Sequence, residues 1–392
     1  MIEAVPFWKD ERKLAILFQV LLLTVVVAVL LFLGYMASTN MAARNLQFSF
    51  GFLTEPADFQ IYEGYTVAKE QGRWILRLYH PSDQVWQAMV TGFLNTLRVS
   101  FLGIVLTTVL GVLIGIGRLS SNWLVNRLSF AYVELIRNTP LLVQMVFWYL
   151  AVFLLLPPIR TAPRFHGVIV SNKGVLIPWP VPDAAWAGFA PYFYAGLALW
   201  ALLWLMRSVW RPPRWLYWLT PVVAWGLGLY LVGSIPLELS VPQVQGFRVE
   251  GGMQLSPEFS SVLLALVLYT ASYIAEIVRG AIQSLPKGQW EAPASLGLSY
   301  AQTLRLIILP QAMRIVIPPL GNQYLNLTKN SSLAIAIAFP EIMSVYETTV
   351  NQAGHSIEGI LIVMAAYLSL SLFISALINW YNVKVALVGV AR

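Results

Sequence analysis

Long apolar runs separated by short polar segments dominate the sequence. The hydrocarbon core of a bilayer is about 30 Å thick, and a helix needs roughly 20 residues to cross it. Runs of that length without an interior pair of charges fall near residues 14–36, 93–117, 138–157, 190–206, 215–233, 259–278, 314–340 and 358–380. Because lipid cannot pair with backbone polar groups, each run is expected to be helical. The pattern predicts an all-α, polytopic membrane protein with about eight transmembrane helices.

Two details of the runs refine this picture. The first run is too long for the core of a signal peptide and is not followed by a small-residue cleavage pattern, so we expect it to remain as a membrane anchor. The fourth and fifth runs are separated only by residues 207–214, where Pro212 and Pro213 prevent a continuous helix. These two runs are therefore expected to form a tight hairpin.

Two long segments between the runs, 37–92 and 158–189, are rich in proline, glycine and aromatic residues. We expect ordered caps or lateral helices there, not separate domains. The sequence contains no convincing internal repeat of the kind that builds a transporter from two inverted halves. A second membrane subunit is therefore expected to complete any translocation pathway.

The composition supports a membrane protein and excludes other classes. Hydrophobic residues make up 58% and charged residues 11%, with a mean hydropathy of +0.68, whereas a soluble protein would carry about twice as much charge. The net charge of +7 comes from basic residues in short segments between apolar runs, which does not suit a nucleic-acid partner. With no cysteine and only three distant histidines, no disulfide, thiolate site or metal cluster is expected.

The distribution of basic residues predicts the orientation, because cytoplasmic loops carry an excess of lysine and arginine. With the N-terminus inside, the inside segments hold fifteen: Lys9, Arg12, Lys13, Arg118, Arg127, Arg137, Arg207, Arg211, Arg214, Arg279, Lys287, Arg305, Arg314, Lys384 and Arg392. The outside segments then hold eight: Arg44, Lys69, Arg73, Arg77, Arg160, Arg164, Lys173 and Arg248. Both termini are therefore expected in the cytoplasm.

The segment between the sixth and seventh runs, residues 285–310, carries the most informative motif. It predicts a short helix that begins near Pro286 and ends at Gly297 in a left-handed conformation. Ser299 is expected to cap a second helix, which Pro310 should close. The resulting helix–turn–helix would project from the membrane, with Glu291 offering a charge to an arginine of a partner.

This segment resembles the "EAA" loop of the permeases of bacterial ABC importers, through Glu291-Ala292, Gly297 six residues after the glutamate, and the later Ile307, Leu309 and Pro310. In that family the loop is the coupling helix, which docks into a groove of a separate ATPase subunit and transmits its motion. Pro293 replaces the alanine that is usual at the third position. The resemblance implies a coupling role for Gly288, Glu291, Ala292, Ala294, Gly297, Ile307, Leu309 and Pro310.

Further stretches narrow the resemblance. Residues 95–97, 134–144 and 275–282 are similar to the polar amino-acid uptake branch, and residues 318–333 look like the general L-amino-acid permeases. The resemblance covers about 93–156 and 259–385. It implies the type I ABC-importer permease fold (MetI-like) with an added N-terminal helix and an inserted helical hairpin. The expected parts are 1–92, 93–157, the insertion 158–258, and 259–392 with the coupling loop.

The resemblance also implies the partners and the location. It implies a subunit that takes up amino acids delivered by a periplasmic binding protein, with a dimer of ATPase subunits and a second homologous permease, in a heterodimer or a homodimer. The chain lacks the Gly-x-x-x-x-Gly-Lys-Ser/Thr loop and any catalytic constellation. No enzyme activity and no cofactor are therefore expected on this chain, with ATP and Mg²⁺ on the partner. The expected location is the bacterial inner membrane.

Polar residues within the apolar runs are candidates for the substrate pathway, since ionisable groups there usually face a cavity or a partner. One hypothesis is a broken helix whose freed backbone groups line the route. The alternative is hydrogen bonding between packed helices, and for Glu276 a local ion pair with Arg279. The candidates are Asn95, Glu276, Asn326, Lys329, Asn330, Ser331 and Ser332.

Two other functions remain open from the sequence. An ion-coupled secondary transporter would need carboxylates within the membrane and a pair of repeats in the chain, and the runs are almost free of aspartate and glutamate. A membrane scaffold that does not transport would leave the motif at 285–310 unused. Uptake without an ATPase would favour the first, and normal uptake in Glu291 or Gly297 variants would count against the assignment of the loop.

Overall fold

The computed structural model describes residues 11–43, 48–70, 72–206, 213–246 and 248–385. Short 3-10 turns (η2, Gly51–Thr54; η4, Phe153–Leu155; η7, Ser331–Ile337) and π-helical turns (η3, Trp148–Val152; η6, Leu304–Ile308) adjoin the α-helices. The α-helices are α1 (Glu11–Ala43), α2 (Val85–Gly117), α3 (Trp123–Arg137), α4 (Leu141–Phe147), α5 (Trp186–Leu205), α6 (Arg214–Val232), α7 (Pro257–Gln283), α8 (Gly288–Ser295), α9 (Tyr300–Thr303), α10 (Leu309–Asn330), α11 (Ile342–Ala353) and α12 (Ser356–Val385).

The predicted polytopic helical architecture is confirmed. Among the described residues, seven helical segments are long and apolar enough to cross a membrane, and a bent pair formed by α3 and Leu141–Leu155 makes an eighth when counted as one span. They fall on all eight apolar runs. The predicted break at Pro212 lies outside the described residues, and Pro213 next to it is the N-cap of α6.

The third run, 138–157, is helical over Leu141–Leu155 and is preceded by a sharp bend. α3 and Leu141–Leu155 meet at an angle of 100°. Pro140 is the N-cap of α4, and a proline cannot donate a backbone hydrogen bond and disfavours helical conformation in the residue before it. The Tyr132 hydroxyl of α3 donates to the Leu268 carbonyl of α7 at 2.6 Å. The first half of the bent span is thus fixed along α7.

The pair α2 and α7 forms the centre of the bundle, and glycines set its close approach. A Cβ atom added at Gly111 would lie 2.6 Å from Cβ of Ile274, and one added at Gly115 would lie 2.8 Å from Cβ of Val278. Buried apolar side chains from α2, α4, α7 and α10 fill the neighbouring core: Val99, Met145, Phe259, Leu266 and Leu327. The glycines of the second run therefore serve helix packing, as in many membrane bundles.

The segments between spans are caps made of short strands, and the lateral helices considered for them are not found among the described residues of 37–92 and 158–189. Strand β1 pairs antiparallel with β2 in the first cap, and the second cap holds a four-stranded sheet of order β10-β5-β4-β3 with the pairs β6–β7 and β8–β9. The strands are β1 (Tyr65–Glu70), β2 (Arg73–Leu78), β3 (Arg164–Phe165), β4 (Val168–Ser171), β5 (Gly174–Ile177), β6 (Trp179–Pro182), β7 (Leu237–Ser240), β8 (Gln243–Gln245), β9 (Arg248–Glu250) and β10 (Met253–Leu255).

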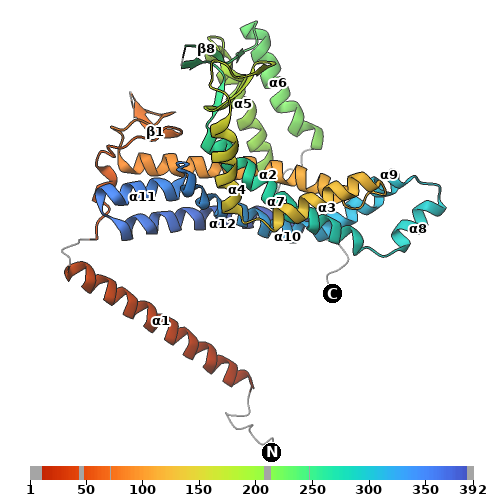
Figure 1. The fold of residues 1–392 in the computed structure, drawn as a ribbon, viewed down its shortest axis with the longest axis horizontal. Coiled ribbons are helices and arrows are strands. Elements are labelled where there is room, and N and C mark those ends of the chain that lie inside the picture. The colour runs from red at the N-terminus through yellow and green to blue at the C-terminus, as the bar shows by residue number, and fades with distance from the viewer. Residues whose placement is uncertain (1–10, 44–47, 71, 207–212, 247, 386–392) are drawn as a thin grey trace, which may run out of the picture.

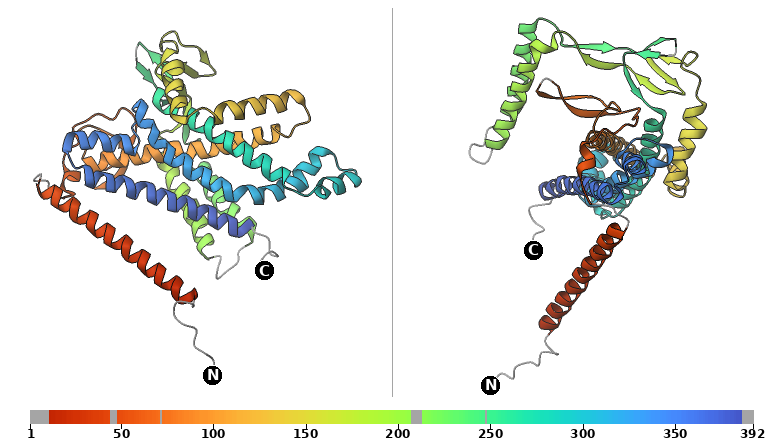
Figure 2. Two further views of the ribbon diagram at one scale, coloured as in Figure 1. Left: turned by 60° about the horizontal axis from the view of Figure 1, so that its bottom comes forward. Right: turned by 90° about the vertical axis from the view of Figure 1, so that its left-hand side faces the viewer.

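The inserted hairpin of α5 and α6 extends from the second cap. Strands β6 and β7 pair directly before α5 and after α6, in the register Trp179 to Ser240. The two helices are held together by the Trp225 indole, which donates to the Phe193 carbonyl at 3.2 Å and stacks on the Phe193 ring. Figure 2 shows this hairpin standing beside the bundle as an arm of the cap.

Helix α1 stands apart from the bundle, and the chain after it is fixed to α12 (Figure 1). The Ser49 amide donates to Glu358 Oε1 at 2.9 Å, and the Phe52 ring stacks on His355 at a centroid distance of 4.5 Å. In Figure 1 α8 lies at the end of the bundle opposite β1, and α12 runs from the β1 side toward the α8 side. The bundle thus has a β-capped end and an α8 end.

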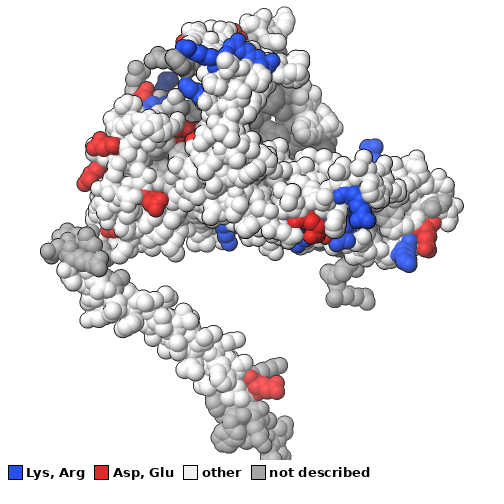
Figure 3. All heavy atoms as spheres, in the orientation of Figure 1, with Lys and Arg blue, Asp and Glu red and all other residues white. Residues whose placement is uncertain are grey.

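Charged side chains follow the same division. In Figure 3 lysine, arginine, aspartate and glutamate gather over the caps and near α8, and they are sparse over the middle of the helices. An apolar band flanked by charged ends is the pattern of a protein solvated by lipid around its middle.

Candidate functional site

The loop at the α8 end begins as its sequence predicts. α8 runs from Gly288 to Ser295, and Gly297 follows it in the left-handed region at φ +80°. Ser299 caps α9: its hydroxyl accepts from the Gln302 amide at 3.3 Å, and the Gln302 side chain accepts from the Ser299 amide at 2.9 Å. The helix–turn–helix is therefore confirmed up to Thr303, and Pro293 lies inside α8 without ending it.

The prediction that Pro310 closes the second helix is wrong. α9 passes through the π-helical turn η6 directly into α10, and Pro310 lies in the first turn of α10. A π-turn widens the helix by one residue, and a proline in a first turn lacks only an N–H that would have no helical partner there. Tyr300–Ile337 is consequently one apolar helical segment, so the second helix of the loop and the seventh span form a continuous rod.

α8 presents two different faces. Glu291, Ala292 and Leu296 are exposed, with Leu296 82% accessible. On the opposite face Pro293 is buried, and Trp290 packs against the apolar cluster between α7 and α10. An exposed leucine beside a carboxylate and small residues at the tip of a projecting loop is a surface suited to a protein partner.

The other residues of the coupling motif divide between these environments. Gly288 and Gly297 have no atom within 4 Å of an added Cβ, and Pro310 is exposed. Ile307 and Leu309 instead pack against the cluster between α7 and α10. The side chain of Ala294 lies outside the described residues. The motif therefore combines an exposed face on α8 with an internal attachment through η6.

The seventh run changes helix type where the polar residues lie. α10 ends at Asn330 and continues as the 3-10 turn η7, which ends at Ala338 with φ +57°. The Ser331 hydroxyl donates to the Thr328 carbonyl at 2.7 Å and the Ser332 hydroxyl to the Lys329 carbonyl at 2.8 Å. The expected break is a change from α-helix to 3-10 helix. The two serines donate to neighbouring carbonyls, so fewer backbone groups are free there than the sequence suggested.

One face of α10 carries polar side chains that the described part of the chain does not cover. Asn322, Asn326 and Lys329 are exposed and follow one another by four and three residues, so they share a helix face. They lie within the segment long and apolar enough to span the membrane. An amide and ammonium stripe at that depth needs a polar cavity or a second polar surface beside it.

Two other pathway candidates are used within the protein. Asn95 is 2% exposed, and its amide donates to the carbonyls of Glu63 and Pro340, both at 2.9 Å. Glu276 pairs with Arg279 at 2.8 Å, as one alternative predicted, and also with Arg118 at the end of α2 at 3.2 Å. Arg118 is a partner that the sequence did not indicate, because it lies 158 residues away on another helix.

A polar cluster that the sequence pattern did not indicate lies beside Asn95. Glu341 is fully buried between η7 and α11; Oε1 accepts from the Ser344 amide and Oε2 from the Tyr367 hydroxyl, both at 2.8 Å. The Thr96 hydroxyl accepts from the Ile342 amide at 3.2 Å. Burial raises the pKa of Glu341 above its usual range, against the hydrogen bonds that lower it. The cluster joins α2, α11 and α12.

A polar cavity of about 630 Å³ opens at the capped end. Five separate segments form its walls: the first cap, Leu154 of η4, the β4–β5 turn, β10 with the start of α7, and the stretch from Ala338 into α11. It carries charges of both signs, from Glu63, Lys173 and Glu258. Glu63 is held by Arg98 at 2.6 Å, and Glu258 accepts from the Tyr149 hydroxyl at 2.9 Å. The cavity leads toward η7 and thus toward the polar end of α10.

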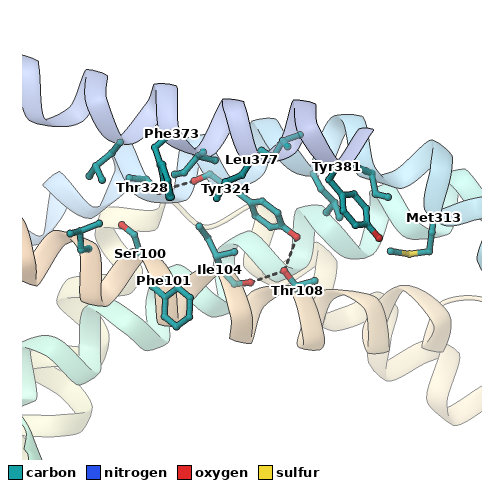
Figure 4. A pocket seen from close by; sticks show the side chains of 16 residues that line it. Ser100, Phe101, Ile104, Thr108, Met313, Tyr324, Thr328, Phe373, Leu377 and Tyr381 are labelled. Carbon is teal, nitrogen blue, oxygen red and sulfur yellow. Dashed lines mark hydrogen bonds between the residues drawn. The ribbon is translucent and has the colours of Figure 1, made fainter. Parts of the chain in front are cut away.

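A second cavity, of about 470 Å³, lies between α2, α10 and α12 (Figure 4). Apolar side chains such as Phe101, Leu377 and Ile378 line most of it. The Thr108 hydroxyl donates to the Ile104 carbonyl at 2.6 Å and accepts from the Tyr324 hydroxyl at 2.8 Å, so both hydroxyls have partners. A groove of this kind suits hydrocarbon and does not suit a zwitterion.

Comparison with known proteins agrees with this architecture. The family described as "Binding-protein-dependent transport system inner membrane component" matches residues 107–386. The general L-amino acid transport system permease protein AapQ of Rhizobium johnstonii is 39% identical over 97% of this chain and 94% of its own length. The glutamate/glutamine/aspartate/asparagine transport system permease protein BztB of Rhodobacter capsulatus is 36% identical over 96% of this chain and 95% of its own.

A crystal structure titled as an amino acid ABC transporter with histidines is similar at a TM-score of 0.46 and 20% identity, covering 76% of this chain and 94% of that chain. The family match spans more than half of the chain, and the two relatives are matched over nearly their whole length. The chain therefore belongs to the family of inner membrane components of binding-protein-dependent transport systems, as a multi-pass membrane protein.

Proposed function

We propose that this chain is a permease subunit of an ATP-driven importer of amino acids. The observation that carries the proposal is the loop at 285–310: a docking face on α8 is attached, through the Gly297 turn and η6, to a span whose exposed face is polar. The names of the relatives, which are amino-acid permeases, support the substrate class. An ATPase that moves α8 would thereby move α10.

The proposal assigns the two ends of the bundle. The α8 end, with both termini, faces the cytoplasm and meets a dimer of ATPase subunits, which bind ATP and Mg²⁺. The capped end faces the periplasm and receives a binding protein. The surplus of basic residues in the inside segments supports this orientation.

The proposed route of the amino acid begins in the cavity at the capped end and follows the exposed face of α10. Charges of both signs around the cavity match a zwitterion. Asn326, Lys329 and Asn330 are the proposed lining residues on α10, with Ser331 and Ser332 supporting the turn that follows. A second homologous permease is expected opposite this face, because one chain leaves it uncovered.

An ion-coupled transporter is the rival that the test must exclude. The purified chain, with its ATPase and binding protein, is reconstituted in proteoliposomes and given a mixture of radiolabelled L-amino acids. Uptake that requires ATP and the binding protein supports the proposal. Uptake driven by a Na⁺ or H⁺ gradient without the ATPase would refute it.

A further inference from the structure

A side-chain hydrogen bond connects α8, in the coupling loop, with the first turn of α10. Gln289 lies in the first turn of α8 and Gln311 in the first turn of α10. The Gln311 amide Nε2 donates to Gln289 Oε1 at 2.8 Å. The bond spans 22 residues of chain and is partly buried, so it is shielded from water.

Two apolar contacts hold α8 in the same position. The Trp290 ring stacks on Tyr300 of α9 at a centroid distance of 5.7 Å and an interplanar angle of 20°. Trp290 also packs against the cluster formed by α7 and α10, which includes the buried Ile308 and Ala312. Gln289 and Trp290 thus hold α8 in place, whereas Glu291 and Leu296 face outward.

This division of α8 has a mechanical consequence. A force applied to the exposed face at Glu291 and Leu296 can reach α10 along the chain, through the packing of Trp290 against the cluster between α7 and α10, or through the Gln289–Gln311 hydrogen bond. Along the chain it must cross Gly297, whose left-handed backbone has no side chain packed against it. Through Gln289 and Gln311 the force reaches the first turn of α10 directly, which is a shorter route than the chain through Gly297.

We propose that the Gln289–Gln311 hydrogen bond is the latch that makes α8 move as one body with α10, so that ATP hydrolysis is coupled to transport. Both glutamines are positioning residues, since they touch neither substrate nor ATP. Without the latch α8 still presents its docking face and the ATPase still binds and turns over. The hydrolysis, however, moves α8 without moving α10 fully. This inference rests on the proposed function of the loop.

The test compares ATP hydrolysis with uptake in proteoliposomes that contain the whole complex and the binding protein. The variants are Gln311→Ala, Gln289→Ala, the double variant, and Gln289→Glu, which keeps an acceptor for the Gln311 amide. Gln283→Ala is the matched control, because Gln283 is an exposed glutamine of α7 that accepts only from Arg279 in this region. The amount of ATPase that copurifies is measured for each.

Each alanine variant is expected to retain the ATPase subunit and its basal hydrolysis, while the ATP consumed per amino acid transported rises about fivefold, the effect of one lost hydrogen bond. The double variant should be no worse than either single variant, because the same bond is lost once. Gln289→Glu and Gln283→Ala should keep the wild-type ratio.

An unchanged ratio in Gln311→Ala overturns the latch, and so do additive effects in the double variant. Loss of the ATPase subunit from the alanine variants also overturns it, because the glutamines would then serve docking. A wild-type complex without ATP-driven uptake would instead refute the proposed function, so the two failures are distinguishable.

Discussion

The amide of Asn95, on α2, ties together two turns that are far apart in the sequence: it donates to the carbonyl of Glu63 and to that of Pro340, 245 residues later, each at 2.9 Å. The side chain is 2% exposed, so no water replaces these bonds when it is changed. The capped end of α2 is thereby fixed to both the first cap and the turn before α11.

Replacing Asn95 should destabilise the protein even when the volume of the side chain is kept, because two hydrogen bonds are lost. Asn95→Leu keeps the volume but leaves two buried carbonyls without this donor, which is expected to cost about 2 kcal/mol in the free energy of unfolding. Thermal unfolding in detergent measures it as a lower midpoint. Ser369→Ala, which removes an exposed hydroxyl bonded within its own helix, is the control and should leave the midpoint unchanged. Equal midpoints for the two variants would contradict the role of Asn95.

The buried Glu341 predicts how stability depends on pH. Because its pKa is raised in the folded protein, the folded state binds the proton more tightly than the unfolded chain. This contribution is fully present below the unfolded pKa of about 4.3 and is lost as pH rises through the folded pKa. The midpoint of unfolding should therefore fall as the pH rises from the unfolded pKa toward the folded pKa of Glu341.

The Glu341→Gln variant tests this assignment. Its amide cannot ionise, so the fall of the midpoint with pH should be smaller than in the wild type. The measurement is the difference between the two midpoints across the pH range. A difference that stays constant with pH would show that another group causes the dependence.

Alanine substitution is expected to have opposite effects at two glycines, Gly111 at the contact of α2 with α7 and the exposed Gly280. Gly111→Ala places a Cβ 2.6 Å from Ile274, and the overpacking is expected to cost about 1–3 kcal/mol. Gly280→Ala, on α7, has no atom within 4 Å and should raise stability by about 0.5 kcal/mol, because alanine favours helix. The midpoints of thermal unfolding of the purified variants test both effects. An unchanged midpoint in Gly111→Ala would mean that α2 and α7 are less closely packed than these distances require.

The ammonium of Lys329 is expected to attract the carboxylate of the amino acid in transit. Lys329→Gln should reduce ATP-driven uptake more than about tenfold, the effect of losing one charge-assisted hydrogen bond. Lys329→Arg keeps the charge and should retain most uptake. If the glutamine variant transports normally at equal membrane levels, α10 does not line the route through this residue.

The sequence predicted the features that depend on local patterns. Apolar length located all eight spans, and a glycine three residues before Tyr300 located the end of the α8 turn, because few other residues adopt a positive φ. The continuation of the helix through Pro310 was missed, since a π-turn depends on packing against α7 and has no residue signature of its own.

Other features depend on contacts between distant residues. The caps are built of strands of two to six residues, too short for an alternating pattern to distinguish them from loops. The uses of Asn95 and Glu276 became clear only when Pro340 and Arg118 were found beside them. The spacing of the polar candidates along the chain could not separate residues with internal partners from residues that line a pathway.

The central claim is that α8 faces the cytoplasm and docks an ATPase, and the absence of native cysteines allows a direct test. Leu296→Cys, on the exposed face of the loop, is compared with Leu76→Cys on β2, whose leucine is 62% exposed at the capped end. In intact cells a membrane-impermeant maleimide should label only Leu76→Cys, and in isolated membranes a short crosslinker should join only Leu296→Cys to the ATPase subunit. Labelling of Leu296→Cys from outside the cell, or failure to capture the ATPase through it, would contradict the account.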